Sequence, residues 1–220
     1  IEGYGECVAE EGPWYSYETV ETAWHVLSQF MIPLVLKKDF ESPEELLLSL
    51  KRIRGHNMAH AAIEEAFMDA YAKAMKTPLS KLLGGVKNRI ESGVSIGIQE
   101  TVEKLLKNIE KYLEEGYRRI KIKIKPQWDL KVVEEVRKAY PEISLMVDAN
   151  GAYTINDFSH LQKLDDYNLL MIEQPLDYDD LVFHAELQSK METPICLDES
   201  IPNLSSAQAA LRLGSCRIIN

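Results

Sequence analysis

Cysteine is scarce in this sequence. The 220 residues contain 3 cysteines, Cys7, Cys196 and Cys216, and a small, odd number argues against a secreted domain held together by disulfides. Each of them stands in an apolar, strand-like context. We therefore expect buried free thiols in a reducing, cytoplasmic compartment, with a catalytic thiol as the alternative.

Positive charge and long apolar runs are lacking as well. Lys and Arg number 25 against 35 Asp and Glu, which gives a formal net charge of −10. Phosphate binding needs a positive surface, so we expect no nucleic-acid partner. No apolar stretch approaches the length of a membrane span, so we expect no membrane partner either. No secretory signal is present, although the chain starts at Ile1 as if entered midway, which leaves a missing leader open.

What the sequence has is the composition of a globular protein, with 45% hydrophobic and 27% charged residues. This length and composition suit one large or two smaller domains. Residues 1–88 carry helix signals: Ser16 is the predicted N-cap of a helix that Pro33 ends, and Ser42-Pro43 predicts a second helix start. A third, alanine-rich helix is expected over Asn57–Met75.

Residues 89–220 alternate short apolar strands with amphipathic helices, which predicts a parallel sheet covered by helices. An open doubly wound sheet and a β/α barrel are the two candidates. No glycine-rich phosphate loop follows the first strand, which weighs against a dinucleotide-binding sheet. Reactive residues at successive strand ends favour the barrel. A complete barrel has more strands than the six visible here, so we expect the chain to be incomplete. The expected strands are Gly93–Gly97, Tyr117–Ile124, Leu145–Asp148, Leu170–Glu173, Ile195–Asp198 and Arg217–Asn220.

One strand has strict alternation. Ile120, Ile122 and Ile124 alternate with Lys121 and Lys123. Period two puts the isoleucines on one face of a strand and both lysines on the other. A surface ribbon could carry this pattern too, so its meaning depends on the strands that follow.

Three of the following strands end in a carboxylate, at Asp148, Glu173 and Asp198. The intervals from Lys123 to Asp148, then to Glu173 and then to Asp198 are each 25 residues. A fixed period of this length indicates a repeating strand-and-helix unit. The three carboxylates would therefore converge at one edge of the sheet.

Three converging carboxylates repel one another unless a cation neutralises them. All-carboxylate ligation suits Mg²⁺ or Mn²⁺ better than zinc. A single acid at a strand end more often caps the next helix or pairs with a lysine, but three at equal spacing favour a shared cation. Lys121 and Lys123 would face the same cavity. A lysine near a metal and a second ammonium group can act as a base.

The segments that carry this chemistry resemble the muconate-lactonising branch of the enolase superfamily. Within that branch, residues 120–129 and 194–201 resemble o-succinylbenzoate synthases and the related N-acylamino acid racemases. The resemblance covers nearly the whole chain. It implies an α/β protein, in which an α+β capping domain within 1–88 precedes the first six strands of a TIM-type barrel within 89–220, with the fold incomplete at both ends. The segments are Lys121-Ile-Lys123, Asp148-Ala-Asn150, Glu173-Gln-Pro175 and Asp198-Glu-Ser200.

By this resemblance, Asp148, Glu173 and Asp198 are ligands of Mg²⁺, with Mn²⁺ as the alternative cation. Lys123 is the catalytic base and Lys121 its electrostatic partner.

Three further residues are assigned by the resemblance to substrate binding or to the surroundings of the ligands: Asn150, Glu199 and Ser200. Alternation along the strand predicts that Glu199 points to the other side from the ligand beside it. The family also has a second catalytic lysine, expected just after Asn220, and a substrate-covering loop, expected before Ile1.

The implied function is a Mg²⁺-dependent o-succinylbenzoate synthase of menaquinone biosynthesis, a lyase that acts on a small carboxylate and forms a homo-oligomer. The reaction dehydrates a succinyl-hydroxycyclohexadiene carboxylate after a lysine removes a proton next to a carboxylate. A racemase of N-acylated amino acids, or a dipeptide epimerase, is the nearest alternative. An alternative of another class is a non-catalytic truncated barrel that only binds metal or assembles with a complementary piece.

Overall fold

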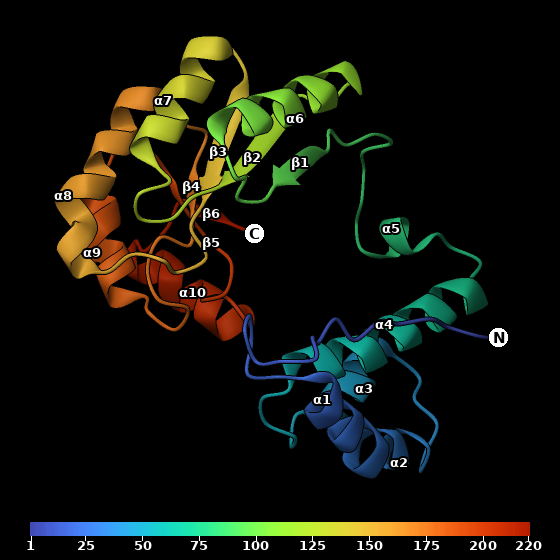
Figure 1. Ribbon diagram of the computed structural model, residues 1–220. Helices are drawn as coiled ribbons and strands as arrows, with labels where there is room; N and C mark the ends of the chain where they lie inside the picture. The colour runs from blue at the N-terminus through green and yellow to red at the C-terminus, as the bar shows by residue number, and fades with distance from the viewer. The chain divides into compact units, whose positions relative to one another are not determined.

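The computed structural model describes residues 1–220 as two compact units, Ile1–Arg89 and Ile90–Asn220 (Figure 1). Each unit has its own buried apolar core. No helix in either unit combines the length and the apolar character that crossing a membrane requires.

The first unit is helical. The first helix begins after Thr19, whose side chain forms a capping box with Thr22, so the prediction of Ser16 as the N-cap was wrong. Thr19 has extended backbone geometry and its Oγ1 accepts from the Thr22 N–H, as a cap requires. Ser42 caps the helix that begins at Pro43, as expected. The elements are α1 Val20–Val26, η1 Leu27–Met31, α2 Ile32–Val35, α3 Pro43–Leu50, α4 Asn57–Ala74 and α5 Leu79–Leu82.

The prediction that Pro33 ends the first helix was also wrong. The chain passes through a π-helical segment, Leu27–Met31, and continues as α2 with Pro33 in its first turn. A proline is tolerated in a first turn because the N–H it lacks has no partner there in any case. The π-turn before it resets the hydrogen-bond ladder, since the Ile32 N–H donates to the Leu27 carbonyl.

Helix α4 organises the first unit. The extended segment at the start of the chain lies so close to it that a Cβ on Gly3 would stand 1.9 Å from the Ala66 carbonyl oxygen. The buried Glu18 carboxylate accepts from the Met58 and Ala59 N–H groups at 2.8 and 3.1 Å. It therefore supplies the N-terminal cap that His56, at the cap position, does not provide.

The second unit contains one parallel sheet of six strands in the order β1-β2-β3-β4-β5-β6. A doubly wound sheet would reverse its strand order part-way, whereas consecutive neighbours are the order of a β/α barrel. The prediction of a barrel-type fold, incomplete in this chain, is confirmed. The strands are β1 Gly93–Ile96, β2 Arg119–Lys123, β3 Ser144–Asp148, β4 Ile172–Glu173, β5 Ile195–Leu197 and β6 Ile218–Ile219.

The helices of the second unit lie along the outer face of this sheet (Figure 1). Between β3 and β4 the chain forms three short helical segments rather than one continuous α-helix, because the first and the last are 3₁₀-helical. The elements are α6 Val102–Glu114, α7 Leu130–Ala139, η2 Ile155–Asp157, α8 Phe158–Leu161, η3 Gln162–Tyr167, α9 Val182–Lys190 and α10 Leu204–Leu213.

Alternation along the strands separates two environments, as predicted for β2. Ile120 and Ile122 are fully buried in the large core between the sheet and its helices. On the opposite face, Met146, Met171 and Cys196 form a smaller apolar cluster. The lysines of β2 share that second face because they alternate with the isoleucines.

Candidate active site

Strand register places three of the predicted site residues in one row. Lys123 on β2 pairs with Asp148 on β3, and Asp148 pairs with Glu173 on β4, as their common interval predicts. The row continues at Cys196 on β5. Asp198 therefore lies farther along its strand direction than equal spacing suggests, beyond the end of β5 at Leu197.

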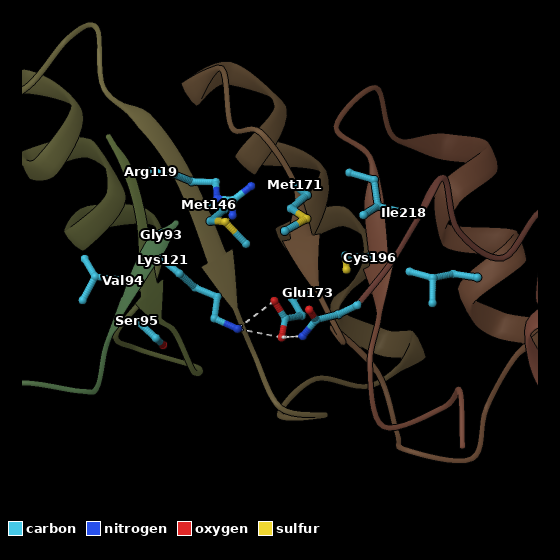
Figure 2. Close-up of a pocket in the computed structure, with 12 residues that line it drawn as sticks. Gly93, Val94, Ser95, Arg119, Lys121, Met146, Met171, Glu173, Cys196 and Ile218 are labelled. Atoms are coloured by element: carbon cyan, nitrogen blue, oxygen red, sulfur yellow. Dashed lines mark hydrogen bonds and ion pairs between the residues drawn. The ribbon is translucent and has the colours of Figure 1, made fainter. Parts of the chain in front are cut away.

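Two lysines contact the buried carboxylates directly. The Lys121 Nζ donates to Glu173 Oε1 at 2.8 Å and Oε2 at 2.9 Å, and lies 3.2 Å from Oδ2 of Asp148. The Lys123 Nζ donates to Asp148 Oδ2 at 2.7 Å and also to Asn150 Oδ1. Figure 2 shows Lys121 reaching across the sheet to Glu173. The carboxylates are 1% exposed, whereas the lysine side chains are 20% and 30% exposed.

The two carboxylates differ in charge environment despite equal burial. Burial acts to raise the pKa of Asp148, but the hydrogen bond and charge of Lys123 and the charge of Lys121 outweigh it and hold that pKa below its ordinary value. Burial raises the pKa of Glu173, and the nearby charges of Asp148 and Asp198 add to the effect against the single hydrogen-bonded lysine. Glu173 is thus the acid that gains most from additional positive charge.

Lys121 responds to the same charges. Burial disfavours its ammonium form, but the hydrogen bond to Glu173 and the charges of Asp148 and Glu173 prevail and raise the Lys121 pKa. In this arrangement Lys121 is a fixed cation that bridges two acids. Lys123 contacts one acid and an exposed amide, so it is the less restrained of the two.

Asn150 and Glu199 extend the network to the end of β5. The Asn150 Nδ2 donates to Glu199 Oε1 at 2.8 Å, so Asn150 bridges Lys123 and Glu199. The expectation that Glu199 points away was wrong, because β5 has already ended at Leu197 and alternation no longer applies. Burial raises the pKa of Glu199, and its Oε2 is buried with no hydrogen-bond partner.

Ser200 and Asp198 belong to the turn after β5. Ser200 is buried, and its Oγ accepts from Gln174 Nε2 at 2.7 Å, so it supports the turn from within. The Asp198 N–H donates to Gln174 Oε1 at 3.1 Å. The inner face of the sheet lines a cavity of about 320 Å³, and Lys121 and Glu173 are among its lining residues (Figure 2).

The acids at this edge suit a hard divalent cation in their chemistry. Asp148, Glu173 and Asp198 are oxygen donors at the ends of adjacent strands, and carboxylates are what Mg²⁺ prefers. In the side-chain arrangement seen here no group of three or more His, Cys, Asp or Glu is placed to hold a metal, since the ammonium of Lys121 bridges two of the acids. The partnerless Oε2 of Glu199 is a further oxygen at this edge.

Two residues of this edge received no role from the sequence. In the sequence Gln174 is the middle residue of the Glu173-Gln-Pro175 segment, and in the structure its side chain accepts a hydrogen bond from the N–H of Asp198. Asn220 was noted only as the last residue, yet its Nδ2 donates to Glu173 Oε1 at 3.3 Å. Period two from Ile218 would have placed Asn220 on the inner face, but no local signal reveals the partners of a buried amide such as Gln174.

Comparison with protein families finds two matches that together cover most of the chain. Residues 104–220 match the enolase C-terminal domain-like family, and residues 1–84 match the N-terminal domain of the mandelate racemase / muconate lactonizing enzyme family.

Curated relatives extend the likeness over the whole chain. An o-succinylbenzoate synthase from Geobacillus stearothermophilus is 57% identical over 220 residues, which is 100% of this chain and 59% of the relative. An N-succinylamino acid racemase from Thermus thermophilus is 49% identical over 220 residues, again 100% of this chain and 60% of the relative. The chain thus spans about three fifths of the length of the curated relatives it matches.

Solved structures are similar in fold. An enolase superfamily member from Listeria innocua superposes with a TM-score of 0.95 at 45% identity, covering 99% of this chain and 59% of that one. A muconate lactonizing enzyme from Pseudomonas fluorescens, complexed with muconolactone, superposes with a TM-score of 0.92 at 28% identity, covering 100% of this chain and 61% of that one.

Proposed function

Because this chain belongs to the mandelate racemase / muconate lactonizing enzyme family of the enolase superfamily, we propose that the protein is a Mg²⁺-dependent o-succinylbenzoate synthase. Support comes from relatives with that name at 45% to 57% identity. The observation that carries the proposal is the row in which Lys123, Asp148 and Glu173 are paired neighbours, with each acid bound by a lysine. Residues 1–88 would form part of a capping domain, and residues 89–220 the first six strands of the barrel.

Asp148, Glu173 and Asp198 would hold the cation, Mg²⁺ or alternatively Mn²⁺. When bound, the cation supplies positive charge that stabilises the enediolate form of the substrate carboxylate. The charge environment of Glu173 supports this assignment, because burial and two neighbouring acids already disfavour its negative charge.

Lys123 is the proposed base. It stands in the row of the acids, and 30% of its side chain is exposed. It would remove the proton next to the substrate carboxylate, and loss of the hydroxyl group would then complete the dehydration. Lys121, bound more deeply between Asp148 and Glu173, would contribute fixed positive charge.

Racemisation of N-succinylated amino acids is the second candidate. Relatives named N-succinylamino acid racemase are 49% and 43% identical to this chain, and an L-Ala-D/L-Glu epimerase is 28% identical. Epimerisation needs an acid or base on each face of the carbanion, whereas syn-dehydration can use Lys123 alone. The candidate of another class is a truncated barrel that only binds metal or assembles with a complementary piece.

The test is activity of the full-length protein, a proposed homo-oligomer, on both substrate types with Mg²⁺ present. We expect dehydration of the succinyl-hydroxycyclohexadiene carboxylate to o-succinylbenzoate, abolished by Lys123→Ala. Racemisation with no dehydration would replace the synthase by the second candidate. Magnesium binding with neither activity would favour the non-catalytic alternative.

A further inference from the structure

Gln174 follows Glu173 and is completely buried. Its Oε1 accepts from the N–H groups of Asp198 at 3.1 Å and Ser200 at 3.3 Å. Its Nε2 donates to the Ser200 Oγ at 2.7 Å. One side chain directly after β4 is therefore hydrogen-bonded to three groups of the turn after β5.

The same Nε2 also donates to carbonyl oxygens of its own loop, at Leu176 (3.2 Å) and Asp177 (3.1 Å). The backbone of Gln174 adds two bonds, from its N–H to the Cys196 carbonyl and from the Gly151 N–H to its carbonyl, both at 2.8 Å. Gln174 thus connects the loops after β3, β4 and β5.

The backbone of Gln174 adopts an energetically unfavourable conformation. The φ of Gln174 is +38°, in the left-handed region that residues with a Cβ rarely adopt. Such backbone geometry persists where the surroundings determine it, and it concentrates at functional sites. Here the surrounding hydrogen bonds fix both the backbone and the amide of the residue.

The turn after β5 needs such support because strand pairing does not reach Asp198. Asp148 and Glu173 are the last residues of β3 and β4 and have register partners on both sides. The last paired residue of β5 is Leu197, so the backbone N–H of Asp198 relies on the Gln174 side chain instead.

We propose that Gln174 is a positioning residue for Asp198, which fixes the turn so that the Asp198 carboxylate stands at the proposed cation site; this inference rests on the proposed function. Gln174 contacts neither substrate nor cation in this role. It acts through the backbone of the Asp198 turn. The supporting partners of metal ligands commonly contribute about 10- to 100-fold to metal affinity.

A general contribution of buried amides to stability is the competing explanation, and the chain contains a matched control for it. Gln188 is also buried, and it serves the opposite end of β5. Its Oε1 accepts from the Ile195 N–H at 2.7 Å, and its Nε2 donates to the Met191 and Thr193 carbonyls at 3.4 and 3.3 Å. The two glutamines flank one strand, but only Gln174 lies at the end that carries Asp198.

The experiment compares Gln174→Met with Gln188→Met in the full-length protein, by calorimetric Mg²⁺ titration and by NMR amide exchange without metal. We expect Gln174→Met to weaken Mg²⁺ binding by about 10-fold or more and to accelerate exchange of the Asp198 and Ser200 amides selectively. Gln188→Met should accelerate exchange at Ile195 and leave Mg²⁺ affinity within about twofold of the original protein. Gln174→Asn, which keeps the amide and tolerates left-handed φ but is too short to reach, serves as a second variant if Gln174→Met fails to fold.

If the wild-type protein binds Mg²⁺ and both Gln174 variants bind it with the same affinity as the wild type, the positioning role is overturned and the proposed function stands. Equal losses of affinity in the Gln174 and Gln188 variants would reduce Gln174 to a stabilising residue and also overturn it. Absence of Mg²⁺ binding in the wild-type protein would overturn the proposed function and this inference together.

Discussion

Replacement of the lysines on and after β2 by alanine separates their roles in turnover from their roles in stability. Lys123→Ala removes the proposed base, and loss of a general base costs on the order of 10² to 10⁴ in rate. Lys121 lies one pleat deeper, about 7 Å back along the strand. Lys121→Ala should impair turnover less, because it removes fixed positive charge beside Asp148 and Glu173 but leaves the proposed base in place. Lys125 is exposed and pairs through its backbone with Trp128 in a turn, so Lys125→Ala should be nearly normal.

In the absence of metal, the free energy of unfolding should fall more in Lys121→Ala than in Lys123→Ala. Lys121 contacts both buried carboxylates and is 20% exposed, so its removal leaves Glu173 without its lysine and should lower the free energy of unfolding by about 3 kcal/mol, at the lower end for a broken buried ion pair. Lys123→Ala leaves Asp148 paired with Lys121 and should cost about 1.5 kcal/mol, as for one hydrogen bond to a charged group.

The assays are steady-state turnover with Mg²⁺, exchange of the substrate α-proton with deuterated solvent, and urea unfolding in EDTA. Lys123→Ala should stop the exchange on the face that it serves. Loss of turnover in Lys125→Ala with retained turnover in Lys123→Ala would rule out Lys123 as the base and show that the strand register is misassigned. A larger loss of stability in Lys123→Ala than in Lys121→Ala would contradict the assignment of Lys121 as the fixed bridging cation.

Three further results are expected. Calorimetry should show one Mg²⁺ site, strongly weakened by Asp148→Asn, and unchanged affinity would remove Asp148 from the ligand set. Arg137 donates five hydrogen bonds to backbone carbonyls, so Arg137→Ala should cost about 2 to 4 kcal/mol of unfolding free energy. Lys138→Ala should leave that free energy nearly unchanged, because its two ion pairs belong to an exposed side chain; equal losses in the two variants would contradict this ranking. Burial lowers the pKa of His184 below the ordinary 6.5, so on acidification the unfolded chain binds a proton there more readily than the folded chain does. The free energy of unfolding should therefore fall from pH 7.5 to 5.5, and His184→Gln, compared by urea unfolding at both pH values, should lose that contribution.

Side-chain direction within each strand was determined by the sequence alone. Alternation in β2 assigned Ile120 and Ile122 to the helix-covered core and the lysines to the opposite face, and the structure agrees. The equal intervals also predicted that Lys123, Asp148 and Glu173 occupy one row. These features are local because the direction of a side chain in a strand depends only on period two and on the length of the strand-and-helix unit.

Helix ends were predicted less well. Ser16 and Thr19 are both chemically suited to a cap, and the choice of Thr19 depends on where the backbone turns. Pro33 is a helix stop by its own chemistry, yet the preceding π-turn carries the helix past it. The sequence offers several candidates at each end, and packing of the helix in its unit selects among them.

Tertiary structure alone decided the details of the candidate site. Equal spacing placed Asp198 level with the other acids, but β5 pairs through Cys196, and the turn beyond Leu197 carries Asp198 farther on. That turn also brings Glu199 to Asn150, and it is fixed by the buried amide of Gln174. These contacts join residues from different strands, and their geometry depends on the register and on the ends of those strands, which the packing of the whole sheet determines and local alternation does not.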